Sequence, residues 1–234
     1  GAILTELAWE RILYMQEKLG FDGKKLGVKF TPSYDASSPV WFANKVAVTE
    51  GVENGTKSVK ALKVTQAHSS LRDTWQVLWP ISEFYAYSDQ RKNNVNQNPA
   101  FLSVFDGDPF KAAPAKNVDS IRANDVKADD AYSVASNIQN LMFENISTIH
   151  FNKEAGTLID RFDGKQSYSV TVYDAAYSIE ALRIFQRAID ALPVGYGSAD
   201  GAKSLGTAQG KEALMLIKKQ ADFLIKNAKT TNGL

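Results

Sequence analysis

A cluster of aromatic and polar side chains between His68 and Glu83 is the first feature of the sequence that suggests chemistry. Placed on a helix at about 100° per residue, five of its side chains fall within an arc of roughly 80°. They are an imidazole, a guanidinium, two indoles and a carboxylate: His68, Arg72, Trp75, Trp79 and Glu83. A flat apolar ring beside directional hydrogen-bonding groups suits a sugar ring or a peptide side chain. We therefore predict that these five residues form one wall of a ligand-binding groove.

A structural interpretation of the same residues stays open. His68 and Arg72, and likewise Trp79 and Glu83, are ordinary neighbours four positions apart on a helix, at the border between core and solvent. Tryptophan commonly lies at such a border, with its ring buried and its N–H in water. Pro80 should also kink or break the helix, which would change the direction of Glu83.

Paired carboxylates are a second source of candidate chemistry, because glycoside hydrolysis typically needs two carboxyl groups across one sugar bond. Asp160 and Asp163 flank Arg161 near an expected hairpin turn at Asp163-Gly164. Further acids available for such a pair are Asp73, Glu83, Asp89, Asp106, Asp108 and Asp174. Spacing alone selects no pair among 26 acidic residues, so the catalytic residues stay unassigned.

The sequence lacks the residues that several other kinds of site require. The chain has no cysteine, which excludes disulfides, thiolate metal sites and thiol catalysis. Of its two histidines, His150 follows an apolar helical pattern, where a structural role is expected. Gly197–Ser204 approaches the phosphate-binding pattern G-x-x-x-x-G-K-[ST], but Ala202 replaces the second glycine, and we interpret the segment as a linker. We expect no metal site and no cofactor.

The charge balance bears on partners. There are 27 Lys+Arg and 26 Asp+Glu residues, a net charge of +1, with no clustered basic face of the kind that phosphate backbones need. No apolar run approaches the roughly 20 residues that cross a membrane as a helix. We therefore expect no nucleic-acid partner and no membrane span.

Helices dominate the predicted secondary structure, because five segments carry an apolar rhythm of 3.6 residues. These segments are Ile3–Leu19, Lys57–Ser88, a stretch that begins after Asp130, Asp174–Pro193 and Lys211–Ala228. The connections Gly20–Thr56 and Asn93–Lys127 show no sustained period. The β-prone piece Lys45–Val48 and the turn signal Asn54-Gly55 indicate one small β-hairpin at most. The sequence thus predicts an all-α fold of antiparallel helical hairpins with long irregular loops, in a single domain over residues 1–234.

The end of the chain carries a family resemblance. The segment "VYDAAYSIEALRIFQRAIDALP", followed by "GKEALMLIKKQADFLIKNAKTTNG", has an aspartate cap, an Ala-Leu face and a terminal Asn-Gly. It resembles a helical hairpin of α/α-toroid proteins over about the last 65 residues. The resemblance implies a toroid-like fold and a role in binding or acting on polysaccharides, and no catalytic motif carries over.

The leading functional hypothesis is a bacterial binding domain with a polar-aromatic groove for a glycan or a peptide. One alternative is a polysaccharide-active enzyme, a hydrolase or lyase of the toroid class that uses paired carboxylates. Another is a structural fragment of a larger helical-repeat protein, whose apolar face is covered by a neighbouring domain or by self-association. A helical pattern directly after Gly1 suggests that a leader has been removed, which favours the periplasm or secretion and leaves the cytoplasm open.

Overall fold

The protein combines helices with small antiparallel sheets, which corrects the predicted all-α fold. A computed structural model describes residues 2–30, 33–89, 95–96, 131–195 and 202–228. Of these residues, 51% are helical and 19% lie in strands. The prediction of an all-α fold is wrong mainly because much of the segment from Gly20 to Ser70 forms strands, where the sequence indicates loop and helix.

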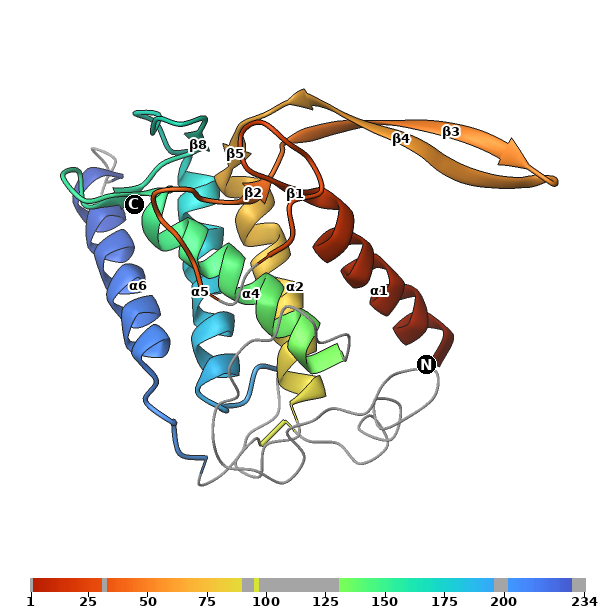
Figure 1. Ribbon diagram of the computed structural model, residues 1–234. Helices are drawn as coiled ribbons and strands as arrows, with labels where there is room; N and C mark the ends of the chain where they lie inside the picture. Colours follow the sequence, from red (N-terminus) through yellow and green to blue (C-terminus); the bar gives the residue numbers. More distant parts are fainter. Residues whose placement is uncertain (1, 31–32, 90–94, 97–130, 196–201, 229–234) are drawn as a thin grey trace.

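Four helices form the bundle that makes up most of the body (Figure 1). They are α2 (Leu71–Ser88), α4 (Ala131–Thr148), α5 (Val172–Ile189) and α6 (Ala208–Asn227). Helices α2 and α5 run parallel, since Arg72 in the first turn of α2 bonds Asp174 in the first turn of α5. Helix α4 runs in the opposite direction along α2, because Tyr132 at its start stacks on Tyr85 near the end of α2. Helix α6 returns antiparallel to α5 (Figure 1).

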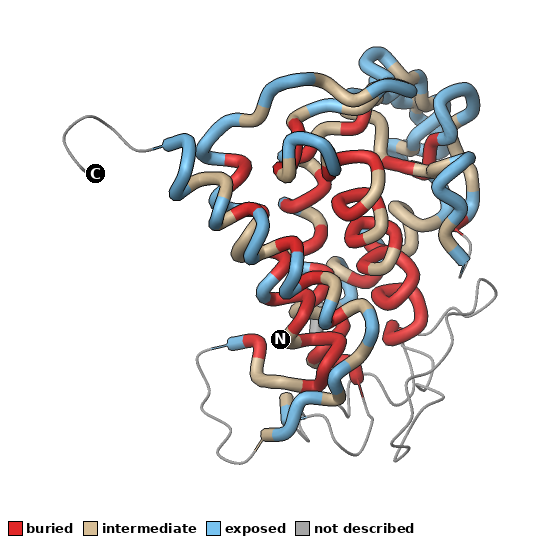
Figure 2. The backbone as a smooth tube through the Cα atoms, turned by 90° about the vertical axis from the view of Figure 1, so that its left-hand side faces the viewer, coloured by how far each residue is buried: buried red, intermediate tan, exposed pale blue. Residues whose placement is uncertain are grey.

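Helix α4 lies at the centre of the core. Most of its residues are buried, whereas α6 alternates buried and exposed positions along one side of the body (Figure 2). The rings of Phe143 in α4 and Phe185 in α5 stack with their centroids 4.3 Å apart. Leu78 of α2 and Ile138 of α4 are fully buried in the same cluster. Removal of this apolar surface from water is the main force that holds the bundle together.

Helix α1 (Ala2–Tyr14) and the π-helical turn η1 (Met15–Leu19) flank the bundle at its edge (Figure 1). Trp9 and Ile12 are buried against the core. Gly20 ends the helical segment as the sequence predicts. Only glycine fits there, because a Cβ would lie 2.1 Å from the carbonyl oxygen of Val28.

Three two-stranded antiparallel sheets cover the end of the bundle at which α2 and α5 begin (Figure 1). They pair β1 (Gly20–Phe21) with β2 (Trp41–Phe42), β5 (Ser69–Ser70) with β8 (Arg161–Phe162), and β6 (Phe151–Asn152) with β7 (Thr157–Leu158). Gly164 has a positive φ of 92°, so a turn forms at the predicted Asp163-Gly164 position. The backbone N–H of Leu71 donates to the carbonyl of Asp160, which ties the start of α2 to this cap.

Residues 45–66 form a long hairpin, here called the arm, which projects from the body beyond α1 (Figure 1). Strands β3 (Lys45–Glu53) and β4 (Thr56–Gln66) are joined by Asn54 and Gly55. Both turn residues have positive φ, 51° and 77°, as the Asn-Gly signal predicts for a two-residue hairpin turn.

A β-bulge in the arm explains why the sequence wrongly indicates a helix over residues 57–66. The strand pairing skips Lys60, which is an extra residue in β4. This bulge shifts the apolar alternation by one residue, so Val59 and Leu62 lie three positions apart. A spacing of three is also typical of helices, and the two structures therefore share one apolar pattern here.

Of the remaining predictions, the helices are mostly confirmed, the kink at Pro80 is wrong, and two segments lie largely outside the described residues. Helix α2 begins only at Leu71 and continues through Pro80, where the sequence suggests a kink or a break; this proline is exposed. Helices at the other four predicted segments are present, with ends that shift by a few residues. The predicted loop Asn93–Lys127, with Asp106 and Asp108, lies outside the described residues except for 95–96. Of the glycine-rich segment Gly197–Ser204, only 202–204 are described.

Candidate functional site

Arg72 and Trp75, two of the predicted site residues, meet at a buried carboxylate of another helix. The guanidinium of Arg72 donates through Nε to Asp174 Oδ1 at 2.9 Å and through Nη2 to Oδ2 at 3.0 Å. The indole Nε1 of Trp75 donates to Asp174 Oδ1 at 3.1 Å. The hydroxyl of Thr171 donates to Oδ2 at 2.6 Å. The two oxygens of the Asp174 carboxylate therefore accept four hydrogen bonds, which is about the number they can accept. The carboxylate thus serves to position Arg72 and Trp75.

The helix ends place these groups. Ser70 caps α2, since its hydroxyl accepts from the backbone N–H of Asp73. Thr171 caps α5 in the same way, with the backbone N–H of Asp174 donating to its hydroxyl at 3.0 Å. Because the two helices start side by side, Arg72 in the first turn of α2 reaches Asp174 in the first turn of α5.

The electrostatics of Asp174 follow from these contacts. Burial acts to raise the pKa of its carboxyl, but hydrogen bonds from Arg72, Thr171 and Trp75 outweigh burial and hold the pKa below its usual value. The same pair raises the pKa of the Arg72 guanidinium. Asp160 differs: burial, with the nearby charge of Asp174, raises the pKa of its carboxyl. The two carboxyl groups thus have opposite shifts.

Two tyrosines of α5 extend this cluster to the surface. Tyr173 and Tyr177, here called the tyrosine platform, have ring centroids 4.5 Å apart and are 51% and 41% exposed. Trp75, only 5% exposed, stacks behind Tyr177 at 5.2 Å with an interplanar angle of 16°. The guanidinium carbon of Arg72 lies 5.2 Å from the centre of the Tyr173 ring. The platform is therefore a partly exposed aromatic surface, backed by Trp75 behind Tyr177 and with the Arg72 cation over the ring of Tyr173.

The other three predicted site residues lie away from the contacts around Asp174. Trp79 packs against the core and donates from Nε1 to Glu83 Oε1 at 3.0 Å, one turn further along α2. His68 precedes the helix and is half-buried. Burial and the charge of Arg161 lower the pKa of its imidazole. Of the five predicted residues, the structure brings together Arg72 and Trp75, and separately Trp79 and Glu83.

His150 forms a buried serine–histidine pair. Its Nδ1 lies 3.0 Å from the carbonyl oxygen of Ile159, which can only accept, so Nδ1 carries the proton. Nε2 then accepts from the hydroxyl of Ser69 at 2.9 Å. Burial lowers the pKa of His150 to about 4, so the ring is neutral at neutral pH. Since both side chains are buried, a structural role follows, as the sequence suggests.

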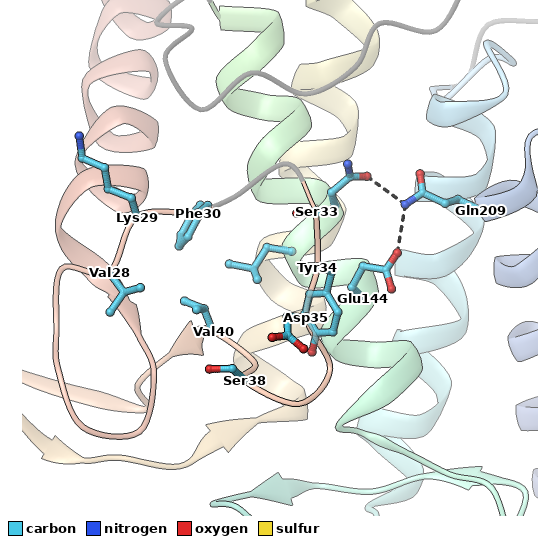
Figure 3. Close-up of a pocket in the computed structure, with 12 residues that line it drawn as sticks. Val28, Lys29, Phe30, Ser33, Tyr34, Asp35, Ser38, Val40, Glu144 and Gln209 are labelled. Atoms are coloured by element: carbon cyan, nitrogen blue, oxygen red, sulfur yellow. Dashed lines mark hydrogen bonds between the residues drawn. The ribbon is translucent and has the colours of Figure 1, made fainter.

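A second candidate site is a cavity of about 230 Å³ between the loop after β1, α4 and the start of α6 (Figure 3). Its polar lining includes Lys29, Ser33, Asp35, Ser38, Asn140, Glu144 and Gln209. The amide of Gln209 donates to Asn140 Oδ1 and to Glu144 Oε1, both at 3.2 Å. Burial raises the pKa of the Glu144 carboxyl, whereas hydrogen bonds from Ser37 lower that of Asp35. Two carboxyl groups with opposite shifts therefore line one cavity.

Sequence reasoning missed several of these residues. Tyr173 and Tyr177 flank Asp174 and are four positions apart, a spacing that places both on one helical face. This spacing is a signal for a shared surface, but in the sequence it also fits an ordinary helical hairpin. Asp35 and Glu144 come together through tertiary packing, and no local pattern relates two residues so distant in the chain.

No family model, curated protein or solved structure matched the chain. No helix in the described part of the chain is long and apolar enough to cross a membrane. The site is therefore interpreted from its own geometry.

Proposed function

We propose that the protein is a binding domain whose tyrosine platform takes a neutral glycan. The observation that carries this proposal is the exposure of Tyr173 and Tyr177 on a rigid backing. The two rings lie side by side as one aromatic surface, and an aromatic face packs well against the C–H groups of a sugar ring. Because Trp75 is held in place by Asp174, the platform is ordered before a ligand arrives.

The charge of the site favours a neutral ligand. Arg72 is paired with Asp174, so its positive charge is compensated and does not call for an anionic partner. Among the described residues, no hydrogen bond uses Nη1 of Arg72 or the hydroxyls of Tyr173 and Tyr177, so these groups can donate to sugar hydroxyls. In this proposal Arg72 keeps its predicted role in binding, Trp75 supports the platform from behind, and His68, Trp79 and Glu83 lie outside it.

Tryptophan fluorescence tests the proposal, because Trp75 stacks directly on Tyr177. We expect a saturable emission change on titration with one or more neutral oligosaccharides of a panel. Tyr177→Ala should weaken this binding at least tenfold. Tyr168→Ala is the matched control, since Tyr168 is 99% exposed, and it should leave the affinity unchanged. Saturable binding of acidic glycans or of peptides alone, or no binding at all, would contradict the proposal.

A second candidate function is glycoside hydrolysis in the cavity of Figure 3. The specific observation in its favour is the raised pKa of the Glu144 carboxyl beside the lowered pKa of the Asp35 carboxyl. An acid with a raised pKa and a carboxylate with a lowered pKa on one cavity match the two roles that this reaction divides between its residues.

Product analysis after incubation with neutral polysaccharides tests this second function. Hydrolysis at this cavity predicts cleavage that is abolished by Glu144→Gln and by Asp35→Asn. Asp163→Asn, which changes an exposed carboxylate of the Asp163-Gly164 turn, serves as the control and should retain cleavage. Binding of glycans without any cleavage would contradict hydrolysis and leave glycan binding by the tyrosine platform as the one proposed function.

A further inference from the structure

The side of α2 that borders the tyrosine platform carries further polar groups beyond it. Trp75 stacks on Tyr177 and so marks the edge of α2 that faces α5. Four side chains at intervals of three or four residues follow this edge and are here called the α2 row: Arg72, Gln76, Trp79 and Glu83. At about 1.5 Å per residue, the row is about 16 Å long. It therefore extends along α2 well past Tyr173 and Tyr177, which lie beside its beginning.

The outer part of the α2 row has groups that a ligand can reach. Gln76 is exposed, and among the described residues no hydrogen bond uses its side-chain amide. Trp79 and Glu83 are partly exposed, and the indole Nε1 of Trp79 donates to Glu83 Oε1 at 3.0 Å. This bond holds the Glu83 carboxylate next to the Trp79 ring and leaves Oε2 without a hydrogen bond in the described part of the chain. An amide, an aromatic ring and a carboxylate oxygen thus lie within about two helical turns.

Helix α5 supplies the opposite side of this surface. It runs parallel to α2, with Asp174 at the level of Arg72. Equal steps along the two helices bring Glu180 to about the level of Trp79, one turn beyond the platform. Glu180 is partly exposed and accepts from Nε of Arg183 at 2.8 Å. The two helices therefore continue the site in one direction, away from the helix starts.

The two ends of this surface have complementary hydrogen-bonding groups. The platform end offers donors, which are Nη1 of Arg72 and the tyrosine hydroxyls. The far end offers the carboxylates of Glu83 and Glu180 as acceptors. A sugar hydroxyl can use both kinds of group, and its bond to an ionised carboxylate is charge-assisted. Among the described residues Glu83 has no ion-pair partner, so its charge repels an acidic glycan and suits a neutral one.

We infer that the ligand is a linear neutral oligosaccharide that lies along α2 and α5, with a second subsite at Gln76, Trp79 and Glu83. This inference rests on the proposed glycan-binding function. The first sugar packs on the tyrosine platform, and a hydroxyl of a later unit donates to Oε2 of Glu83. The ring of Trp79 gives that unit an apolar contact beside the carboxylate, and Gln76 bonds the chain between the two subsites. A single sugar ring does not span the α2 row, so only a chain uses the second subsite.

Fluorescence titration of the full chain with di- and tetrasaccharides of the cello-, manno- and malto-oligosaccharide series tests the inference. In at least one series the tetrasaccharide should bind at least tenfold more tightly than the disaccharide, because the second contact is intramolecular once the first is made. Gln76→Ala with Glu83→Ala should remove this gain, so that the tetrasaccharide binds no more tightly than the disaccharide. Glu10→Ala removes an exposed glutamate of α1 and is the matched control, which should keep the gain. Circular dichroism confirms that each variant is folded, and Gln76→Ala with Glu83→Gln, which keeps an acceptor for the Trp79 indole, replaces the first variant if that one unfolds.

Tyr177→Ala separates failure of this inference from failure of the proposed function. It should weaken the binding of both lengths, because the platform holds the first sugar in each. Equal affinities for the two lengths, both reduced by Tyr177→Ala, would overturn the second subsite and keep the platform. A gain with length that survives Gln76→Ala with Glu83→Ala would also overturn it, since the chain would then follow another surface. If no oligosaccharide binds, the inference and the proposed function both fail.

Discussion

Arg72 and Asp174, 102 positions apart in the chain, join the first turns of α2 and α5 through two parallel hydrogen bonds. The pair also holds the indole N–H of Trp75, and through that ring it supports the platform of Tyr173 and Tyr177. A carboxylate in the first turn of α5 thereby sets the orientation of an exposed aromatic surface. The Arg72–Asp174 pair therefore contributes both to the stability of the fold and to the proposed binding site. Substitutions can separate these two roles.

Asp174→Ala should lower the free energy of unfolding by about 2–3 kcal/mol, because it removes a charge-assisted acceptor and leaves the buried indole N–H of Trp75 without a partner. Asp163→Ala is the control: its ion pair with Arg161 is exposed on both sides, and its loss should cost under about 0.5 kcal/mol. Urea unfolding followed by circular dichroism measures both. Equal effects of the two substitutions would show that the Arg72–Asp174 pair contributes no more than a surface contact.

His150 should make the protein sensitive to mild acid. Its folded-state pKa of about 4 lies below the ordinary value of 6.5, so the unfolded chain binds more protons between these limits. Stability from this group is therefore fully present above pH 6.5 and is lost as the pH falls towards 4. Between pH 7.5 and pH 5 the loss should be about 2 kcal/mol.

Urea unfolding of the wild type, His150→Gln and His68→Gln at pH 7.5 and pH 5 checks this expectation. His150→Gln removes the titrating ring and should flatten the pH dependence over that interval. His68→Gln changes the other histidine, which is only half-buried, and should retain most of it. If the two variants keep the same dependence as the wild type, carboxyl groups and not His150 set the acid sensitivity.

The parts of the fold that the sequence predicts correctly are those with one dominant local signal. The helix at 172–189 has a regular apolar face and the Asn54-Gly55 turn has its characteristic residue pair, and both are present. Strand β4 was missed because the Lys60 bulge breaks the period of two that identifies a strand. The sheets of two residues per strand were missed because so short a strand has no period at all.

The predicted site, too, is correct only where a local pattern in the sequence relates its residues. Arg72 and Trp75 lie on one helix, so periodicity placed them together correctly. Placing His68 on that helix was wrong, because β5 and the loop before it precede Leu71. Asp174 and the two tyrosines belong to another helix, and the parallel pairing of α2 with α5 is a tertiary fact that no single segment encodes.

Phe143 tests the centre of the core. Its ring stacks on Phe185 and both are fully buried, so Phe143→Ala should cost about 3–5 kcal/mol through lost burial and a residual cavity. Leu214→Ala removes a leucine that is half exposed on α6 and should cost under about 1 kcal/mol. Thermal unfolding of the two variants measures the difference. A small loss for Phe143→Ala would mean that the interface between α4 and α5 collapses to fill the space.

Gly210 should reverse the usual effect of replacing a helical glycine. Alanine in a helix is ordinarily more stable than glycine by about 1 kcal/mol. At Gly210, however, a Cβ would lie 2.5 Å from Asp190 Oδ2 and 2.8 Å from its Oδ1. The Asp190 carboxylate cannot move aside easily, because Gln186, Ser204 and Thr207 all donate to it. Gly210→Ala should therefore lower the free energy of unfolding by about 1–3 kcal/mol.

A double-mutant cycle with Asp190→Ala separates this collision from other effects of the alanine. Asp190→Ala alone should be destabilising, since it removes the acceptor that holds Thr207, the cap of α6, against the end of α5. In that background the obstructing carboxylate is gone, so adding Gly210→Ala should cost nothing or stabilise by up to about 1 kcal/mol. Urea unfolding of the four proteins gives the coupling energy. If Gly210→Ala costs the same in both backgrounds, the backbone at the start of α6, and not contact with Asp190, requires the glycine.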